Sequence, residues 1–354
     1  MILVLNAGSS SLKAELFDTA LISVATAAVT EIGSRGELRC NATRSPAKAA
    51  DHDAALSLIL AALDDAGHPL DRLTACAHRV VHGGADLTAP ARLTVDVIAQ
   101  ITACIPLAPL HNPANLAGIS AMAHLMPGLA QCASFDTAFH ATNPDVASTY
   151  ALPATEQAKG LRRYGFHGLS YAGLIRAIDP LPARLLAFHL GNGASLCAIH
   201  HGRSVATSMG YSPLDGLVMG SRTGSIDGMA VLRLAQDHGI DGASALLNRQ
   251  SGLTALAGTN DMATILARDD AQARFAVDHF CYWAIRHAGS AVAAMGGLDA
   301  IAFTGGIGEN AAPVRDAITA GLAFLGPVPV HSIAAAEERQ IARDALALLG
   351  TRVA

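Results

Sequence analysis

Two short turns rich in glycine, serine and asparagine constrain this chain more than any other feature. They read NAGSSSL at residues 6–12 and LGNGASL at residues 190–196, and the matching residues Ser11 and Ser195 are 184 positions apart in a chain of 354. Apolar runs flank both turns, which predicts a strand, a tight turn and a second strand in each place. Small residues leave consecutive backbone N–H groups exposed beside hydroxyls, as in an anion-binding nest. Either turn alone fits an ordinary hairpin, whereas the matched pair indicates two copies of one phosphate-handling unit.

Apolar periodicity predicts alternating helices and strands in both halves of the chain. Helices are expected at 51–66, 112–126, 228–237, 272–294 and 334–349, and further strands at 73–81, 130–135 and 300–303. This alternation is typical of a layered α/β architecture. The Asn143-Pro144 break places a domain boundary near residue 140.

Composition excludes several classes of protein. A net charge of −5 and a pI near 6.3 argue against a general nucleic-acid or anionic-membrane partner. The six scattered cysteines have no C-x-x-C spacing, so we expect buried, reduced thiols and neither zinc nor disulfides. The chain shows no leader-like N-terminus and no apolar run of membrane-spanning length, so we expect a cytoplasmic protein.

Only 15% of the residues are charged, so polar groups in apolar, glycine-flanked segments are informative. Four such residues are Arg79 in HRVVHGG, Asp136 in FDTAFH, His167 in RRYGFHG and Arg222 in MGSRTG. Each alone is also explained by a structural ion pair or a capped loop. Together with two phosphate turns they form the set that phosphoryl transfer needs, since cations stabilise the charge on the transferred group. The chain has no P-loop sequence and no G-x-G-x-x-G after its first strand, which argues against those two nucleotide folds.

With these segments laid out, the chain resembles the acetate and propionate kinase family of the actin, sugar kinase and Hsp70 superfamily. The matching motifs run in family order: NAGSSSLK (6–13), HRVVHGG (78–84), PLAPLHNP (106–113), FDTAFH (135–140), RRYGFHGLSY (162–171), HLGNGAS (189–195), TSMG-x-x-PL (207–214) and FTGGIGEN (303–310). The resemblance implies a duplicated ribonuclease H-like fold with two domains and an interdomain cleft. Residues 1–140 would form the N-terminal domain, with a helix at about 340–354 packing back on it. Residues 141–339 would form the nucleotide-binding domain.

The same resemblance implies a reversible, Mg²⁺-dependent transfer of the ATP γ-phosphoryl group to acetate, with Mn²⁺ as a possible substitute metal and ADP as the other product. Arg79 and Arg222 would hold the carboxylate and the transferred group, His167 would donate to that group, and Asp136 would orient the attacking carboxylate or help to hold the metal. The metal residues would be Asn6 and Glu337. The alkyl pocket would be lined by Val81, Leu110, Phe166 and Pro213. The nucleotide residues would be Asn6, Ser9, Ser11, Lys13, His189, Asn192, Gly193, Asp261, Gly305, Gly306, Ile307 and Asn310.

The chain departs from the family pattern at several positions. Ala206 replaces an aspartate, Ala263 replaces an arginine commonly next to the adenine, and residues 224–228 lack the usual aspartate and proline. Propionate or butyrate kinase, and a catalytically inactive nucleotide-binding regulator, are the alternatives. A homodimer is expected from the family and from the mean hydropathy of +0.35.

Overall fold

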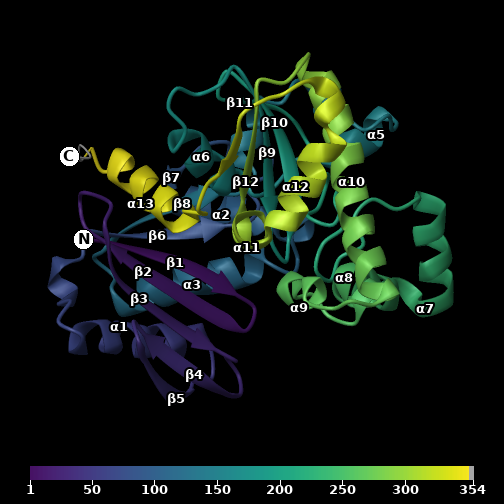
Figure 1. The fold of residues 1–354 in the computed structure, drawn as a ribbon. Coiled ribbons are helices and arrows are strands. Elements are labelled where there is room, and N and C mark those ends of the chain that lie inside the picture. The colour runs from purple at the N-terminus through teal and green to yellow at the C-terminus, as the bar shows by residue number, and fades with distance from the viewer. Residues whose placement is uncertain (351–354) are drawn as a thin grey trace. The chain divides into compact units, whose positions relative to one another are not determined.

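The computed structural model of this chain describes residues 1–350. It contains two compact units, which we describe separately (Figure 1). Unit 1 consists of Met1–Ala138 together with the segment that begins at Ala336, and unit 2 consists of Phe139–Ala335. Unit 1 is therefore built from two separate stretches of sequence.

Unit 1 is organised around an eight-stranded sheet with the order β5-β4-β3-β2-β1-β6-β8-β7. Strand β1 pairs antiparallel with β2 and parallel with β6, and β6 pairs parallel with β8. The strands are β1 (Ile2–Gly8), β2 (Ser11–Phe17), β3 (Ser23–Thr30), β4 (Arg35–Cys40), β5 (Thr43–Lys48), β6 (Ala75–Val80), β7 (Ala91–Arg92) and β8 (Ala130–Phe135).

The helices of unit 1 cover its sheet and bury the apolar side chains. They are α1 (His52–Asp65), α2 (Val95–Ala103), α3 (Asn112–Leu125) and α13 (Glu337–Leu348). The main core joins alternate residues of β1, such as Leu3 and Leu5, to α1 and α3. Helix α13 packs on β1, β6 and β8, which brings the end of the described chain onto the sheet that the first residues begin.

Unit 2 repeats the same strand order on a smaller scale. Its five-stranded sheet is ordered β11-β10-β9-β12-β13, with β9 antiparallel to β10 and parallel to β12. The strands are β9 (Arg184–Leu190), β10 (Ala194–His200), β11 (Arg203–Thr207), β12 (Ala300–Thr304) and β13 (Val330–Ser332). The five strands β3-β2-β1-β6-β8 of unit 1 correspond to β11-β10-β9-β12-β13 of unit 2. Numbered along the chain within each set, both have the strand order 3-2-1-4-5, which is the ribonuclease H-like order. The duplicated fold expected from the sequence is confirmed.

The helices of unit 2 include one long packed helix and one long exposed helix. Helix α10 (Ala271–Met295) packs against β10 and β11, whereas most of α7 (Gly228–Arg249) is exposed and bends at Gly239, whose φ is 73°. The others are α4 (Asp145–Ser148), α5 (Ala154–Gln157), α6 (Gly168–Arg176), α8 (Gly252–Ala257), α9 (Met262–Leu266), α11 (Gly305–Asn310) and α12 (Ala312–Gly321).

Most predicted elements are confirmed, and the differences have physical causes. The strand–turn–strand pairs and the helix capped by Asp51 occur as expected. Helix α7 continues beyond the predicted residue 237 because it resumes after the Gly239 kink. The last helix begins at Glu337 and not at residue 334, because the backbone N–H of Ala335 donates to Glu309 Oε1 (2.9 Å) and holds that segment outside the helix.

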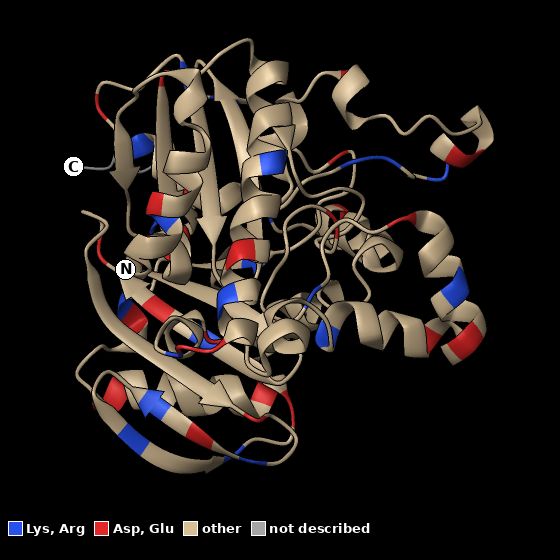
Figure 2. Cartoon of the chain, turned by 45° about the vertical axis from the view of Figure 1, so that its right-hand side comes forward, with Lys and Arg blue, Asp and Glu red and all other residues tan. Residues whose placement is uncertain are grey.

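Composition-based expectations can also be compared with the structure. All six cysteines are free thiols; five are buried as predicted, whereas Cys40 is only partly buried. Within residues 1–350, no helix has both the length and the apolar character that crossing a membrane requires. Charged residues of both signs are distributed over many elements (Figure 2).

Candidate active site

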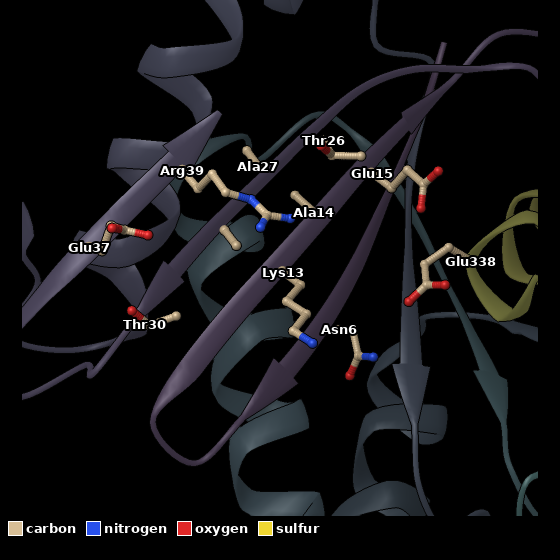
Figure 3. A pocket seen from close by; sticks show the side chains of 11 residues that line it. Asn6, Lys13, Ala14, Glu15, Thr26, Ala27, Thr30, Glu37, Arg39 and Glu338 are labelled. Atoms are coloured by element: carbon tan, nitrogen blue, oxygen red, sulfur yellow. The ribbon is translucent and has the colours of Figure 1, made fainter. Parts of the chain in front are cut away.

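The first phosphate turn is a two-residue hairpin between β1 and β2. Gly8 and Ser11 are its closing pair, and Ser9 and Ser10 at its tip are exposed. Asn6 and Lys13 face each other two pairs further from the turn. Their side chains line a pocket of about 360 Å³, to which Glu15, Arg39 and Glu338 also contribute (Figure 3). The structure therefore places all the first-turn residues of the sequence analysis on one hairpin.

Arg79 joins two carboxylates in the interior of unit 1. It follows His78 in β6, and its guanidinium donates to both oxygens of Asp136, from Nε to Oδ1 at 3.0 Å and from Nη2 to Oδ2 at 2.7 Å. Its Nη1 lies 3.5 Å from Oε2 of Glu337, at the start of α13. The exposed fractions of the three side chains are 20% for Arg79, 3% for Asp136 and 13% for Glu337. The structural ion pair that the sequence analysis gave as an alternative explanation of Arg79 and Asp136 is therefore present. Glu337, which is distant in sequence, also takes part in it.

The ionisation of this cluster is set by burial and by its own charges. Burial lowers the pKa of Arg79, but the charges of Asp136 and Glu337 act in the opposite direction and leave the pKa raised overall. Burial raises the pKa of Glu337 to about 7, Arg79 opposes that rise, and the neighbouring Asp136 adds to it. The cluster therefore holds more negative charge than Arg79 alone neutralises.

These oxygens fit a magnesium ion that completes its coordination with water and phosphate. Mg²⁺ takes oxygen ligands and is commonly held in kinases by one or two carboxylates plus substrate phosphates. Within residues 1–350 no group of three or more His, Cys, Asp or Glu side chains is arranged to hold a metal. Glu337, Asp136 and the Asn6 amide are the residues that would provide it.

Two buried asparagines of α3 position this cluster, and the sequence analysis missed them. Asn115 donates through Nδ2 to the carbonyl of Ala7 (2.8 Å) and accepts from the backbone N–H of Val81 (3.0 Å), so it bridges β1 and β6 where their hydrogen bonding ends. Asn112 bonds both the N–H and the carbonyl of His82. Both amides are 3% exposed or less. The sequence signal that could have revealed them is a pair of asparagines in the first turn of a helix whose other residues are mostly apolar.

The second phosphate turn connects β9 to β10 through three residues, Gly191 to Gly193. The N–H of Gly191 donates to the carbonyl of Gly193 (3.0 Å), which closes the turn. The Asn192 side chain accepts from Asn260 Nδ2 (3.1 Å), and a Cβ added to Gly220 would lie only 2.1 Å from Asn192 Oδ1. Glycine at position 220 is therefore required for this close approach.

His167 and Arg222 meet beside this turn. A Cβ added to Gly193 would lie 3.2 Å from His167 Nε2 and 3.8 Å from Arg222 Nη1. The Arg222 guanidinium donates to the carbonyl of Pro213 (3.1 Å), and no ion pair joins it to a carboxylate in the described part of the chain. Burial lowers the pKa of Arg222. A desolvated cation without a carboxylate, next to an imidazole nitrogen and a glycine turn, is suited to an anionic ligand.

The remaining nucleotide residues occupy separate places in unit 2. His189 lies in β9, and its Nδ1 is 2.8 Å from Ser170 Oγ. The Asp261 carboxylate caps α9 by accepting from the backbone N–H groups of Ala263 and Thr264, so it has a structural role. The other four, Gly305, Gly306, Ile307 and Asn310, form α11 directly after β12. Contact of any of them with a nucleotide stays a prediction.

The four residues predicted to line an alkyl pocket differ in exposure. Phe166 is buried at 1%, Val81 and Pro213 are half-buried, and Leu110 is 48% exposed. Val81 and Leu110 belong to unit 1, whereas Phe166 and Pro213 belong to unit 2. Their common role in binding an alkyl group stays a prediction.

Comparison with known proteins places the chain in a family. The model of the acetokinase family matches residues 1–343. The acetate kinase of Streptomyces avermitilis is 44% identical over 349 residues, covering 92% of this chain and 86% of that protein. Among solved structures, the acetate kinase of Porphyromonas gingivalis has a TM-score of 0.90 at 33% identity, covering 98% of this chain and 99% of the other. A propionate kinase of Francisella tularensis has a TM-score of 0.91 at 34% identity, covering 97% and 98%. The resemblance inferred from the motifs is confirmed, and the chain belongs to the acetokinase family.

Proposed function

We propose that this chain is an acetate kinase, which transfers the γ-phosphoryl group of ATP to acetate and gives acetyl phosphate and ADP. The observation that carries the proposal is the arrangement at the second turn, where Arg222 and His167 border Gly193. A guanidinium that is desolvated and has no carboxylate partner in residues 1–350 is costly for the fold alone. An anionic substrate would offset that cost by supplying the missing negative charge.

The reaction needs positioning and charge stabilisation more than proton transfer. Acetate is ionised at neutral pH, so its carboxylate oxygen can attack the γ-phosphorus directly without a general base. One oxygen–phosphorus bond forms to acetate while the bond from the γ-phosphorus to the bridging oxygen breaks, and ADP leaves with that electron pair. Arg79 and Arg222 would stabilise the carboxylate and the moving group, and His167 would donate to one of its equatorial oxygens. Asp136 would orient the acetate or share the metal.

Magnesium belongs to this proposal as the partner of the nucleotide phosphates. Glu337 would hold it, with Asn6 and, in one of its two possible roles, Asp136. When bound, the ion would neutralise charge on the phosphate oxygens. The pKa of Glu337 is raised by burial first and by the neighbouring carboxylates second, and a divalent cation would offset both effects by favouring the ionised form, which supports this assignment.

The domain roles, the location and the assembly are also proposed. Residues 1–140 with the C-terminal helix would carry the acetate side, and residues 141–339 would bind the nucleotide, in a cytoplasmic enzyme. A homodimer is supported by exposed apolar side chains on α7 and α10 of unit 2, which a second copy would cover: Met229 (71% exposed), Leu232 (56%), Ile240 (80%), Phe275 (57%) and Tyr282 (60%).

A coupled assay with purified protein, ATP, Mg²⁺ and acetate tests the proposal through ADP release and acetyl phosphate formation. Turnover that requires both acetate and Mg²⁺ supports it, and absence of turnover with acetate, propionate and butyrate alike refutes it. The acyl series also measures chain-length preference, for which one methylene contributes about 1–3 kcal/mol. The similarity to a propionate kinase makes propionate the informative competitor.

A further inference from the structure

Two buried hydroxyl groups, of Tyr171 and Ser195, lie on the Nδ1 side of the His167 ring, whereas Nε2 lies beside Gly193. We propose that Tyr171 and Ser195 form a hydrogen-bond relay that keeps the neutral His167 ring in the tautomer with its proton on Nε2. These two side chains would be positioning residues, because they act on the transferred group only through His167. The inference rests on the role proposed above for His167 and specifies how that role is prepared.

The relay is a continuous chain of three side chains from two neighbouring elements. Ser195 Oγ, in β10, lies 2.8 Å from His167 Nδ1 and 2.5 Å from the hydroxyl of Tyr171, one helical turn along α6. Ser195 and Tyr171 are both 0% exposed, so bulk water does not compete for these bonds. Two short hydrogen bonds in a dry interior hold the imidazole in one orientation.

The direction of each bond follows from counting protons. Burial raises the pKa of Tyr171 well above that of an ordinary tyrosine, so the phenol keeps its proton. Either hydroxyl could donate in the Tyr171–Ser195 contact, and the proposed relay assigns the donor role to Tyr171, with Ser195 Oγ as acceptor. Ser195 must then place its own proton on a different acceptor, and His167 Nδ1 is the one within reach. Nδ1 therefore accepts, and the single proton of a neutral imidazole is on Nε2.

The opposite nitrogen faces the proposed ligand. Nε2 of His167 is the atom closest to the space beside Gly193, with Arg222 Nη1 next to it. With its proton on Nε2, His167 presents an N–H group to an incoming phosphoryl oxygen. The other tautomer would present a lone pair to that oxygen and would repel it.

The backbone also fixes the ring in place. His167 precedes α6 with a φ of 58° and a ψ of 20°, in the left-handed region that non-glycine residues enter rarely. Its ring lies 4.2 Å from the ring of His189, centroid to centroid. Strained backbone at a site of this kind persists when surrounding contacts determine it, and the relay is one of these contacts.

The test combines two relay variants with a matched control. Tyr171→Phe removes one hydroxyl and keeps the ring, and Ser195→Ala removes the central oxygen. Removing a donor aimed at developing charge costs about 10²–10³-fold in kcat, and each relay variant should lower kcat by less, about 10-fold to 10²-fold, because His167 itself remains. KM for ATP and for acetate should change less than about threefold, since the binding arginines remain in place. Tyr150→Phe removes a phenol that bonds the backbone N–H of Tyr211 in the same unit, and it should leave kcat unchanged.

A spectroscopic readout separates positioning from structural damage. In the full chain with ¹⁵N-labelled histidine, the two nitrogens of His167 are assigned by their loss in His167→Gln. The wild-type spectrum should show a protonated Nε2 and an unprotonated Nδ1, and both relay variants should lose this pattern. A wild-type spectrum with the proton on Nδ1 overturns the relay, even if the variants fail to fold. Relay variants with normal kcat and an unchanged His167 tautomer also overturn it.

The failure of the relay and the failure of the proposed role of His167 can be told apart. If His167→Gln retains full kcat, the role of His167 is wrong whatever its tautomer. If His167→Gln abolishes turnover while the wild-type proton is on Nδ1, the role stands and the relay is wrong.

Discussion

Replacing Arg79 by methionine should destabilise unit 1 far more than the loss of an ordinary surface ion pair. Arg79 separates Asp136 from Glu337, and its removal leaves two buried carboxylates without the cation between them. Removing one member of a buried pair costs about 3–5 kcal/mol. For a unit of about 150 residues each kcal/mol shifts Tm by about 2–4 °C, so Tm should fall by about 6–20 °C. The same variant should lower kcat by at least about 10²-fold.

The assay is urea unfolding and thermal melting at pH 8, above the pKa of about 7 of Glu337. Arg184→Met is the matched control, because Arg184 forms a similar pair with Asp299 whose side chains are 37% and 33% exposed. That control should lose at most about 1 kcal/mol. Adding Asp136→Asn to Arg79→Met should restore part of the lost stability without restoring activity. An Arg79→Met protein within about 1 kcal/mol of wild type would refute the reasoning, as would a double variant no more stable than the single one.

Three further predictions concern other parts of the structure. Arg222→Met should lower kcat at least about 10²-fold. Its Tm should stay equal or rise, because the substitution removes a desolvated cation, and a Tm loss as large as that of Arg79→Met would contradict this. Gly193→Ala should lower kcat because its Cβ would lie 3.2 Å from His167 Nε2. Gly128→Ala is the control and should not lower kcat, because no heavy atom lies within 4 Å of its Cβ. Equal kcat values for the two variants count against a ligand beside Gly193. Burial lowers the pKa of His78 from 6.5 to about 4, so between these pH values the unfolded chain binds a proton at His78 that the folded chain does not. The free energy of unfolding should therefore decrease as pH falls from 6.5 to 4, by at most about 3 kcal/mol. His78→Gln should remove that part of the pH dependence in urea unfolding, and an unchanged pH profile would show that His78 does not cause it.

The turns and the main elements could be predicted because they depend on local sequence. Small residues between apolar runs determine a hairpin wherever they occur, and the N-cap of α1 needs only Asp51 and its neighbours. The 184-residue spacing was sufficient to suggest the duplication that the two sheets show. These features require no knowledge of distant contacts.

The structural support of the site could not be predicted in the same way. The bond from Asn115 to the carbonyl of Ala7 links residues 108 positions apart, and no local pattern encodes it. Glu337 was matched through family resemblance, but its position beside Arg79 depends on how α13 packs. The Tyr171–Ser195 contact likewise joins a helix to a strand whose register only the fold determines. Sequence pattern selected the candidate reactive residues, and tertiary packing supplies the contacts that hold them.

The return of α13 to unit 1 has a consequence for how the protein is made. Synthesis is vectorial, and domains generally fold in order from the N-terminus as they leave the ribosome. Unit 1 is an exception here, since its sheet lacks α13 until residue 348 has been synthesised, after the whole of unit 2. Glu337 also joins Arg79 and Asp136 only at that stage. A chain interrupted anywhere within unit 2 would therefore contain the first phosphate turn, and also the second if it extended past residue 196, yet it would lack Glu337 of the carboxylate cluster and would be inactive.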